Sequence, residues 1–116
     1  MADTARPGNN NNMTEKQIIE NIRKIAAKTL PVGAHLYLYG SRARGNAHSA
    51  SDWDLLILLN KEKMEATDYD ITYPFREFGW DHGEDIMPHI STISQWQAQD
   101  FSPFYKNVEH DKIVLI

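Results

Sequence analysis

The stretch that decides the fold is GSRARGNAHSASDWDLLILL, residues 40–59. It opens on a Gly-Ser turn, continues through a loop with two arginines and closes on an apolar run from Trp53 to Leu59. A continuous apolar run of this length is typical of a strand that is buried on both faces, as in a sheet covered by helices. The loop therefore connects a short strand over residues 34–39 to a central strand over residues 53–59.

Asp52 and Asp54 stand at the head of the central strand. Because side chains two residues apart on a strand point to the same face, these carboxylates project together while Trp53 points away. Two carboxylates held this close repel each other unless a cation lies between them. Mg²⁺ takes oxygen ligands and keeps waters and substrate phosphates in the rest of its shell. The pair therefore predicts a Mg²⁺ platform at a strand end.

The beginning of the loop has the features of a phosphate site. Gly40 lacks a Cβ and lets the backbone approach an anion closely, and Ser41 offers a hydroxyl and a backbone N–H. If residues 41–44 begin a helical turn, its free N–H groups bind an anion, and Arg42 and Arg44 can clamp phosphate with their forked donors. Each feature alone is most simply a solvated turn or a surface residue. Together they predict phosphoryl or nucleotidyl transfer.

Elsewhere the pattern predicts helices. Apolar residues at helical spacing predict an amphipathic helix over residues 14–30, with Thr14 and Gln17 forming a capping box. A second helix over residues 66–79 contains Pro74, which predicts a kink or a restart.

Two further segments complete the predicted fold. Residues 85–93 read as a third strand, in which Pro88 indicates an edge position or a bulge. Ser94 or Ser102 caps a final helical region, and residues 113–116 pack or pair. The order of elements predicts an α/β domain with a small mixed β-sheet.

Length and composition narrow the function. The 116 residues are expected to form one domain over residues 13–116, preceded by a disordered or non-native tail over residues 1–12. The absence of cysteine excludes a disulfide scaffold, a thiol nucleophile and Cys-ligated metal sites. A net charge of −4 has the wrong sign for gripping nucleic acid through a broad basic face. No apolar run reaches transmembrane length and the start is not a secretory signal, so we expect a cytoplasmic protein.

At these residues the chain resembles the minimal nucleotidyltransferase family of the DNA polymerase β superfamily. The family signature is Gly-Ser, ten residues, then Asp-x-Asp, and Gly40-Ser41, residues 42–51 and Asp52-Trp53-Asp54 meet it without a gap. The local form GSRARG…SDWDL is also typical, and the resemblance extends over most of residues 14–116. It implies a polymerase β-like core, which is a small mixed sheet flanked by helices.

The resemblance also implies a reaction. Members bind a nucleoside triphosphate, usually ATP, with two Mg²⁺; an acceptor attacks the α-phosphorus, NMP is transferred and pyrophosphate leaves. Gly40 and Ser41 match the residues that hold the β- and γ-phosphates, and Asp52 and Asp54 match the first two metal carboxylates. Arg44 matches a basic position that contacts the triphosphate. Arg42 falls at a variable position.

Full members carry a third carboxylate on a later strand, where it completes the second metal site and acts as base. Here that region reads GEDIMPHISTIS, residues 83–94, and Asp85 is the candidate. Glu84 is expected to face the other way, while His89 shares a face with Asp85 and is the alternative group near the site. Pro88 disturbs the usual apolar-Asp-apolar pattern. Without an acid here, the chain would bind nucleotide without efficient turnover.

The acceptor is the open question, because the chain has no length for an acceptor domain. Short members of the family are often encoded beside a small helical protein of the HEPN type, which the nucleotidyltransferase modifies with AMP as its antitoxin. That resemblance implies a protein partner, and an oligomer is possible. The alternatives are a weakly active binding module that neutralises a partner by docking, and a metal-dependent phosphohydrolase that uses Asp52 and Asp54. The phosphohydrolase leaves Gly40-Ser41 without a role.

Overall fold

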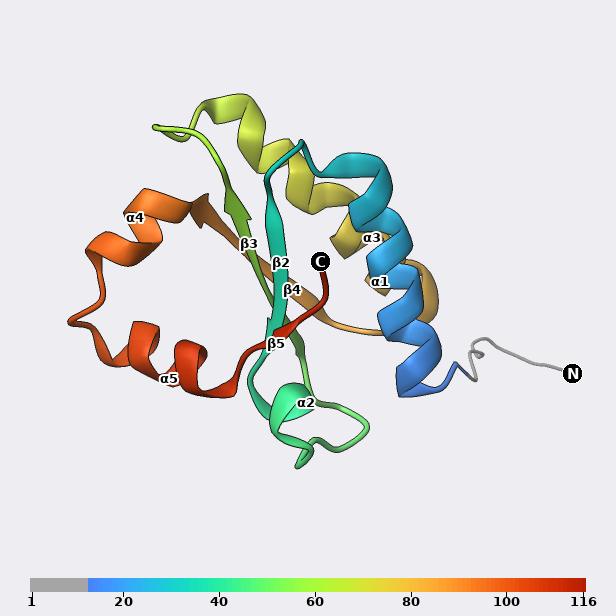
Figure 1. The fold of residues 1–116 in the computed structure, drawn as a ribbon. Coiled ribbons are helices and arrows are strands. Elements are labelled where there is room, and N and C mark those ends of the chain that lie inside the picture. Colours follow the sequence, from blue (N-terminus) through green and yellow to red (C-terminus); the bar gives the residue numbers. More distant parts are fainter. Residues whose placement is uncertain (1–12) are drawn as a thin grey trace, which may run out of the picture.

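The computed structural model describes residues 13–116, so the predicted tail over residues 1–12 lies outside the described part. Its strands form one mixed sheet with the order β4-β3-β2-β5, and helices cover both faces (Figure 1). This is the predicted fold class. In chain order the elements are α1 (Glu15–Thr29), β2 (His35–Tyr39), α2 (Ser41–Arg44), β3 (Trp53–Leu59), the 3₁₀ helix η1 (Ala66–Thr72), α3 (Tyr73–His82), β4 (Ile86–Thr92), α4 (Ile93–Ala98), α5 (Pro103–Asp111) and β5 (Ile113–Val114).

Helix α1 begins at the predicted capping box. The Gln17 amide donates to Oγ1 of Thr14 at 3.1 Å, and the Thr14 amide donates to Oε1 of Gln17 at 2.9 Å. These two bonds satisfy backbone donors that have no partner inside the helix. Ile18, Ile22 and Ala26 then form a buried stripe against the sheet. The helix ends one residue before Leu30, as Pro31 requires.

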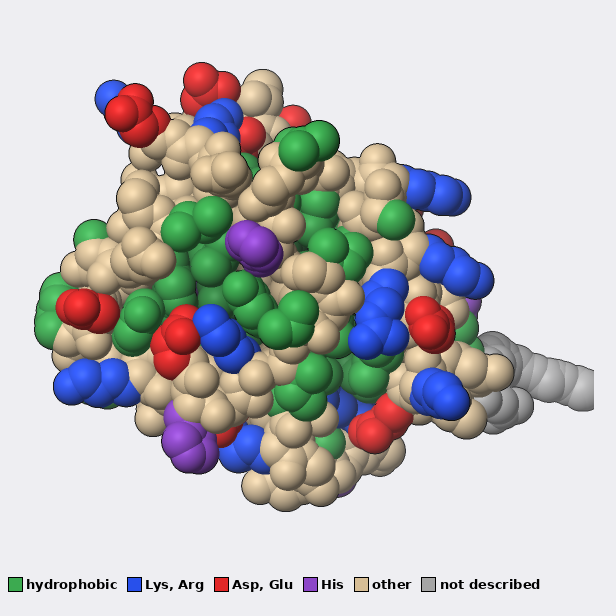
Figure 2. Space-filling view, viewed as in Figure 1, with side chains coloured by type: hydrophobic (Ala, Val, Ile, Leu, Met, Phe, Trp, Pro, Cys, Tyr) green, Lys and Arg blue, Asp and Glu red, His purple; other side chains and the backbone are tan. Residues whose placement is uncertain are grey.

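Strand β3 is the centre of the sheet and separates two apolar layers. Residues 55–59 are at most 4% exposed, which confirms the prediction of burial on both faces. The alternate residues that begin with Trp53 pack with α1 and α3. Leu56 and Leu58 pack with α4 and α5 instead, in the region where hydrophobic side chains gather in Figure 2. Asp54 is two residues before Leu56 on β3 and points to the same face, so it lies on the side of α4 and α5.

Two predicted helices differ in detail from the structure. Residues 66–82 form η1 and then α3, and Pro74 lies in the first turn of α3, where its missing N–H costs nothing. The predicted restart at Pro74 is therefore confirmed. Ser102 caps α5, as predicted. Ser94 caps nothing: β4 runs straight into α4, so Thr92, the last strand residue, supplies the cap.

The sheet edges are β4 and β5. β4 runs parallel to β3, and Pro88 lies on this edge strand, as its sequence position predicted. β5 pairs antiparallel with β2, which confirms that the apolar C-terminal residues pair. Within residues 13–116, no helix is long and apolar enough to cross a membrane.

Candidate active site between β2 and β3

The connection from β2 to β3 brings the two predicted walls of the site together at one end of the sheet (Figure 1). Gly40 has φ 78° and ψ −159°, a region that is essentially restricted to glycine. A Cβ built at Gly40 would overlap the Asp54 carboxylate. The Gly-Ser turn is therefore shaped so that the carboxylate can lie directly against its backbone.

Helix α2 is a single turn over Ser41–Arg44, which confirms the helical turn expected there. The amides of Ala43 and Arg44 donate to the Gly40 carbonyl, both at 3.0 Å. The amides that precede them stand in the first turn and have no partner within the helix. Gly45 ends the turn in the left-handed conformation and sends the chain into the loop that leads to Asp52.

Asp54 sits in an electrostatically unfavourable place for a lone carboxylate. Its pKa is raised first by burial and then by the neighbouring negative charge of Asp52, while Arg44 acts in the opposite direction. Tyr39 pairs with Asp54 across β2 and β3. Burial and the Asp54 charge raise the pKa of Tyr39 to about 12, so its hydroxyl keeps its proton at neutral pH.

Arg44 is held on the Asp54 side by the end of α5. Its Nη1 donates to Oδ2 of Asp111 at 2.7 Å, and its side chain remains 46% exposed. The pKa of Asp111 is lowered first by its hydrogen bond with His110 and then by the one with Arg44. Arg44 is thus preorganised beside the carboxylates and still open to a ligand.

Arg42 lies on the opposite side. Its guanidinium carbon is 4.4 Å from the centre of the Trp53 ring, and its Nη1 donates to Oε2 of Glu15 at 2.6 Å. Trp53 belongs to the α1–α3 layer. The structure therefore brings Arg44, and not Arg42, to the side of Asp54.

The predicted third carboxylate, Asp85, stands at the same end of the sheet. It precedes Ile86, the register partner of Trp53, and its carbonyl accepts the Trp53 amide at 2.8 Å. Asp52 and Asp85 each stand one residue before this pair, at the same end of β3 and β4. Asp85 also lines a polar hollow of about 300 Å³ with loop residues 49–51 and residues 83–84.

The residue that pairs directly with Asp54 on β4 is Met87, which is 44% exposed. His89 is the next residue of β4 on the same face as Met87. Its ring lies edge-on to the rings of Trp96 and Phe104, and burial lowers the pKa of its imidazole. Glu84 accepts the Trp53 indole N–H at 3.0 Å, so it faces away from Asp54 as predicted. Within residues 13–116, no three acidic or histidine side chains converge closely enough to hold a metal ion.

These donors fit one Mg²⁺ rather than a closed cage of protein ligands. Asp52 and Asp54 supply two carboxylates from one face, and a cation would relieve the repulsion that raises the pKa of Asp54. Mg²⁺ commonly binds through one or two carboxylates and completes its shell with waters and substrate phosphates.

Sequence reasoning missed three neighbours of the site. Tyr39 could have been found from the sequence, because it directly precedes the Gly-Ser turn and the pairing of β2 with β3 brings it opposite Asp54. Met87 required the register of β4 against β3. Asp111 is 67 residues from Arg44, and nothing local in the sequence indicates this pair.

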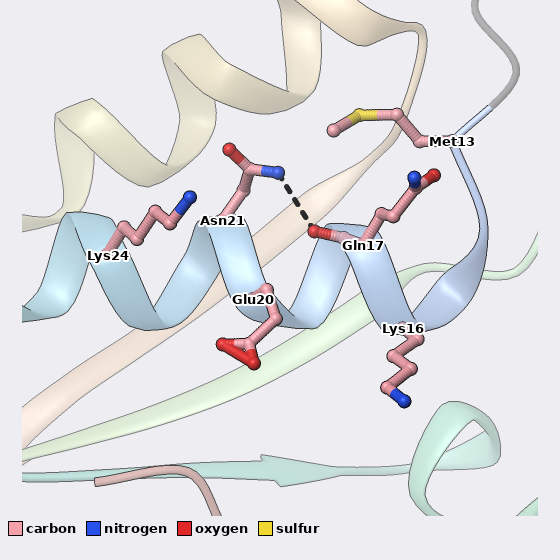
Figure 3. A pocket seen from close by; sticks show the side chains of 6 residues that line it. All are labelled: Met13, Lys16, Gln17, Glu20, Asn21 and Lys24. Atoms are coloured by element: carbon pink, nitrogen blue, oxygen red, sulfur yellow. Dashed lines mark hydrogen bonds between the residues drawn. The ribbon is translucent and has the colours of Figure 1, made fainter.

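Another hollow, of about 430 Å³, lies along α1 and does not include Asp52 or Asp54 (Figure 3). Its lining consists of side chains from α1 and the residue before its cap: Met13, Lys16, Gln17, Glu20, Asn21 and Lys24. These side chains are flexible and polar at their ends, and Asn21 donates back to the Gln17 carbonyl. The hollow is a groove beside a surface helix and adds nothing to the site.

Comparison with solved structures identifies the same fold in toxin–antitoxin complexes. One, with AMP-PNP, aligns with a TM-score of 0.57 and 17% identity over 84% of this chain and 72% of that chain. A MntA-HpeT pair with two aspartate-to-glutamate substitutions aligns at 0.56 and 15%, over 84% and 72%. A tyrosine-to-alanine variant of MntA-HpeT aligns at 0.56 and 16%, over 90% and 73%. At these identities the likeness shows the fold.

Comparison with curated proteins gives no significant match. The family model described as "Nucleotidyltransferase domain" matches residues 19–115, which include the Gly-Ser turn, the paired aspartates and β4. That match spans most of the chain and agrees with the motif and with the fold. The chain therefore belongs to the nucleotidyltransferase domain family and is a transferase of the nucleotidyl-transferring kind.

Proposed function

We propose that this chain transfers AMP from ATP to a hydroxyl group of a partner protein, with Mg²⁺, and releases pyrophosphate. The observation that carries the proposal is the contact between its two walls. The Asp54 carboxylate occupies the space that a Cβ at Gly40 would fill, at the start of the phosphate turn. A ligand bound at the turn therefore lies beside the carboxylates without any rearrangement of the backbone.

Each residue of the candidate site has a role in this proposed reaction. The first-turn amides of α2 and the Ser41 hydroxyl bind and orient the β- and γ-phosphates, and Arg44 offsets their charge from the α5 side. Asp52 and Asp54 would hold Mg²⁺, which when bound neutralises charge on the phosphates and lowers the barrier to attack. Two Mg²⁺ ions, as in full family members, would require a further ligand, for which Asp85 is our proposal.

The reaction then balances as follows. The acceptor oxygen forms a bond to the α-phosphorus, the bond from that phosphorus to the bridging oxygen breaks, and pyrophosphate leaves. Asp85 is our proposed acceptor of the hydroxyl proton, because it directly precedes Ile86, the register partner of Trp53, at the end of the sheet where Asp52 and Asp54 stand. Preorganised charge and positioning contribute most of the catalysis in phosphoryl chemistry of this kind.

We propose that the acceptor belongs to a small helical partner of the HEPN type, to which this chain is the antitoxin. The three structures of the same fold compared above are toxin–antitoxin complexes, and one of them is with AMP-PNP. Apart from the sheet, α1 and α3, the described residues form α2, η1, α4 and α5, which are short elements and do not make a separate acceptor domain. A net charge of −4 suits a basic partner.

The test compares ATP labelled with ³²P at the α- or the γ-phosphate, incubated with Mg²⁺, the protein and a lysate of its source. We expect a labelled band on a denaturing gel from α-labelled ATP only, and no band with Asp54→Asn. The variant Asp81→Asn, which removes the same charge from an exposed position on α3, serves as the matched control. Label from the γ-phosphate, or release of inorganic phosphate, would instead indicate a kinase or a phosphohydrolase.

Two observations favour a second function, a weakly active module that neutralises a partner by docking. The β4 residue paired with Asp54 is Met87, and three metal-binding side chains do not converge within residues 13–116. The two functions separate in a growth assay with the partner toxin. Asp54→Asn abolishes protection if transfer neutralises the toxin, and leaves protection intact if docking does.

A further inference from the structure

We infer that Arg42 is a positioning residue that fixes the segment carrying Asp52 and Asp54 from behind, on the face opposite the ligand. The inference rests on the proposed function in one respect, namely that these carboxylates bind a divalent cation. It concerns a side chain whose sequence position suggested a phosphate ligand, and it assigns that side chain a different task.

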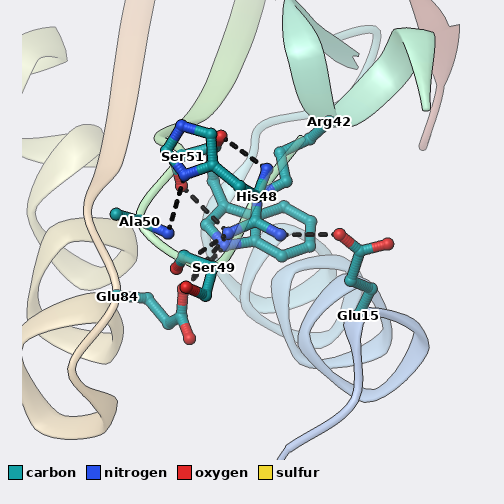
Figure 4. Close-up of polar contacts among 8 residues, drawn as sticks. Glu15, Arg42, His48, Ser49, Ala50, Ser51 and Glu84 are labelled. Carbon is teal, nitrogen blue, oxygen red and sulfur yellow. Dashed lines mark hydrogen bonds and ion pairs between the residues drawn. The ribbon is translucent and has the colours of Figure 1, made fainter. Parts of the chain in front are cut away.

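The contacts of Arg42 reach three separate parts of the chain (Figure 4). Its Nη1 donates to Glu15 in the first turn of α1 at 2.6 Å. Its Nη2 donates to the Ser51 carbonyl at 3.0 Å and to the Ser49 carbonyl at 3.5 Å. The same Nη2 is 3.9 Å from the Glu84 carboxylate, just before β4. One guanidinium therefore ties the loop to α1 and to the start of the neighbouring strand.

Along the chain, the contacts of Arg42 fall just before Asp52 and between Asp52 and Asp54. The Ser51 carbonyl belongs to the peptide bond that leads into Asp52. The Trp53 ring, on which the guanidinium stacks, lies between Asp52 and Asp54. The Trp53 indole in turn donates to Glu84 at 3.0 Å. Arg42 thus contacts the backbone before the first aspartate and the side chain between the two.

Burial makes this role different from that of a surface ion pair. The Arg42 side chain is only 7% exposed, and its buried Nε has no hydrogen-bond partner. An unsatisfied buried donor costs free energy, and the contact of the guanidinium with the Trp53 ring and its bonds to Glu15 and Ser51 act against that cost. To reach a phosphate on the Asp54 side, the guanidinium would have to leave both carbonyls, both carboxylates and the ring.

The loop has few other attachments. Its tip is a local turn in which the His48 amide donates to Ser51 Oγ, the Ala50 amide to His48 Nδ1 and the Ser51 amide to the His48 carbonyl. These bonds keep the shape of the tip, but they do not join it to a helix or a strand. Arg42 provides that join, so its loss should loosen Asp52 together with the tip, whose local bonds then open more often.

The test measures Mn²⁺ binding from the electron paramagnetic resonance signal of free Mn²⁺, in the whole chain. Groups that orient metal ligands typically contribute ten- to hundredfold to metal affinity. We expect Arg42→Met, which keeps an apolar stem over Trp53, to weaken Mn²⁺ binding by about tenfold or more. Arg42→Lys should fall between it and the wild type, because one ammonium can reach Glu15 but lacks the two-armed fork that bonds Glu15 and the loop carbonyls together.

A matched control and a second readout separate positioning from general destabilisation. Arg23 also joins distant segments, since its Nε donates to the Leu115 carbonyl at 3.2 Å, but it does not contact the loop. Arg23→Met should lower the melting temperature and leave Mn²⁺ affinity unchanged. Amide hydrogen exchange of residues 46–52 should quicken in Arg42→Met and stay unchanged in Arg23→Met.

The outcomes are distinct. Wild-type Mn²⁺ affinity and unchanged exchange of residues 46–52 in Arg42→Met would overturn the inference. If the wild type itself binds no Mn²⁺, the proposed function fails, and the exchange of residues 46–52 still decides whether Arg42 holds the loop. If Arg42→Met does not fold, Arg42→Lys and Glu15→Gln decide, because Glu15 is 61% exposed and its loss removes one partner only.

Discussion

Gly40 determines how closely the Gly-Ser turn and strand β3 approach each other. Its φ of 78° with ψ of −159° lies where residues with a Cβ are strained. The Asp54 carboxylate also fills the space in which a Cβ would stand. The backbone conformation and the close approach of the Asp54 carboxylate therefore each require glycine at this position.

Replacing Gly40 by alanine should affect stability and activity together. Backbone strain of this type costs about 1–3 kcal/mol, so we expect Gly40→Ala to lower the free energy of unfolding by that amount in urea. The overlap with Asp54 should also displace the carboxylate and abolish Mn²⁺ binding and AMP transfer.

Gly45→Ala is the matched control for this change. Gly45 also has a positive φ, 81°, but a Cβ there would meet nothing within 4 Å. It should lose about 1 kcal/mol of stability through the left-handed conformation and keep transfer. Full transfer by Gly40→Ala would show that Asp54 does not depend on the close approach.

At this scale the sequence predicted which residues meet but not where every side chain points. The Gly-Ser turn and the paired aspartates follow from local rules, because a turn and a strand of period two fix their directions. The direction of Arg42 follows from Glu15, Trp53 and Glu84, which come from different parts of the chain. No local rule contains that information.

Among the elements, α5 connects the site to the second apolar layer. Its Val108 is buried in that layer, its Glu109 accepts the Trp96 indole N–H at 2.8 Å, and its Asp111 holds Arg44. The helix is short, and short helices depend on their caps and packing. The cap at Ser102 therefore affects both the layer and the position of Arg44.

The Ser102 cap gives a direct test at this scale. The Ser102 hydroxyl accepts the Tyr105 amide at 3.0 Å. We expect Ser102→Ala to lower the free energy of unfolding by about 1 kcal/mol, measured in urea, since the amide then loses its partner. Ser102→Asp should retain the stability of the wild type because aspartate caps as well as serine. An equal loss in both variants would indicate that the hydroxyl is needed for packing instead.

The sequence predicted elements best where one periodicity ran for several turns. Helix α1 and strand β3 carry uninterrupted patterns, and both appear within a residue or two of their expected bounds. The 66–82 segment differed because Pro74 divides it, and a 3₁₀ turn precedes the division. Likewise the start of α4 at Ile93 depends on β4 ending without a loop, a tertiary fact that a serine pattern does not reveal.

For the molecule as a whole, the site costs folding free energy. The pKa of Asp54 is higher in the folded chain, chiefly through burial and then through Asp52. The folded state therefore binds this proton more readily than the unfolded state does. The contribution of Asp54 to stability falls as the pH rises from its unfolded pKa, about 3.9, through its folded value.

Asp54→Asn should therefore stabilise the ligand-free domain while it abolishes transfer. We expect the variant to melt at a higher temperature than the wild type at pH 7, with the difference shrinking as the pH falls to about 4. The carboxyls of lowered pKa, Asp68, Glu109 and Asp111, are present in both proteins and cancel in the comparison.

Divalent cation should reverse the order of these melting temperatures. Under the proposed function, Mg²⁺ with ATP would bind the folded wild type and stabilise it by about 2.7 kcal/mol at a hundredfold excess over Kd. Asp54→Asn lacks one of the two carboxylates that would hold the metal, so Mg²⁺ with ATP should raise its stability less. A wild type that melts above Asp54→Asn at pH 7 without any ligand would contradict this electrostatic account.

Pro88 has a consequence for how this domain can assemble. The Trp53 amide bonds to the Asp85 carbonyl, so the backbone groups of residues 85, 87 and 89 turn toward β3. Those of Ile86, Pro88 and Ile90 consequently turn outward, and the missing N–H of Pro88 falls on that outer edge. The opposite edge, β5, is only two residues long. Both margins are therefore poor templates for an added strand, and edge-to-edge growth of the sheet is disfavoured at each of them.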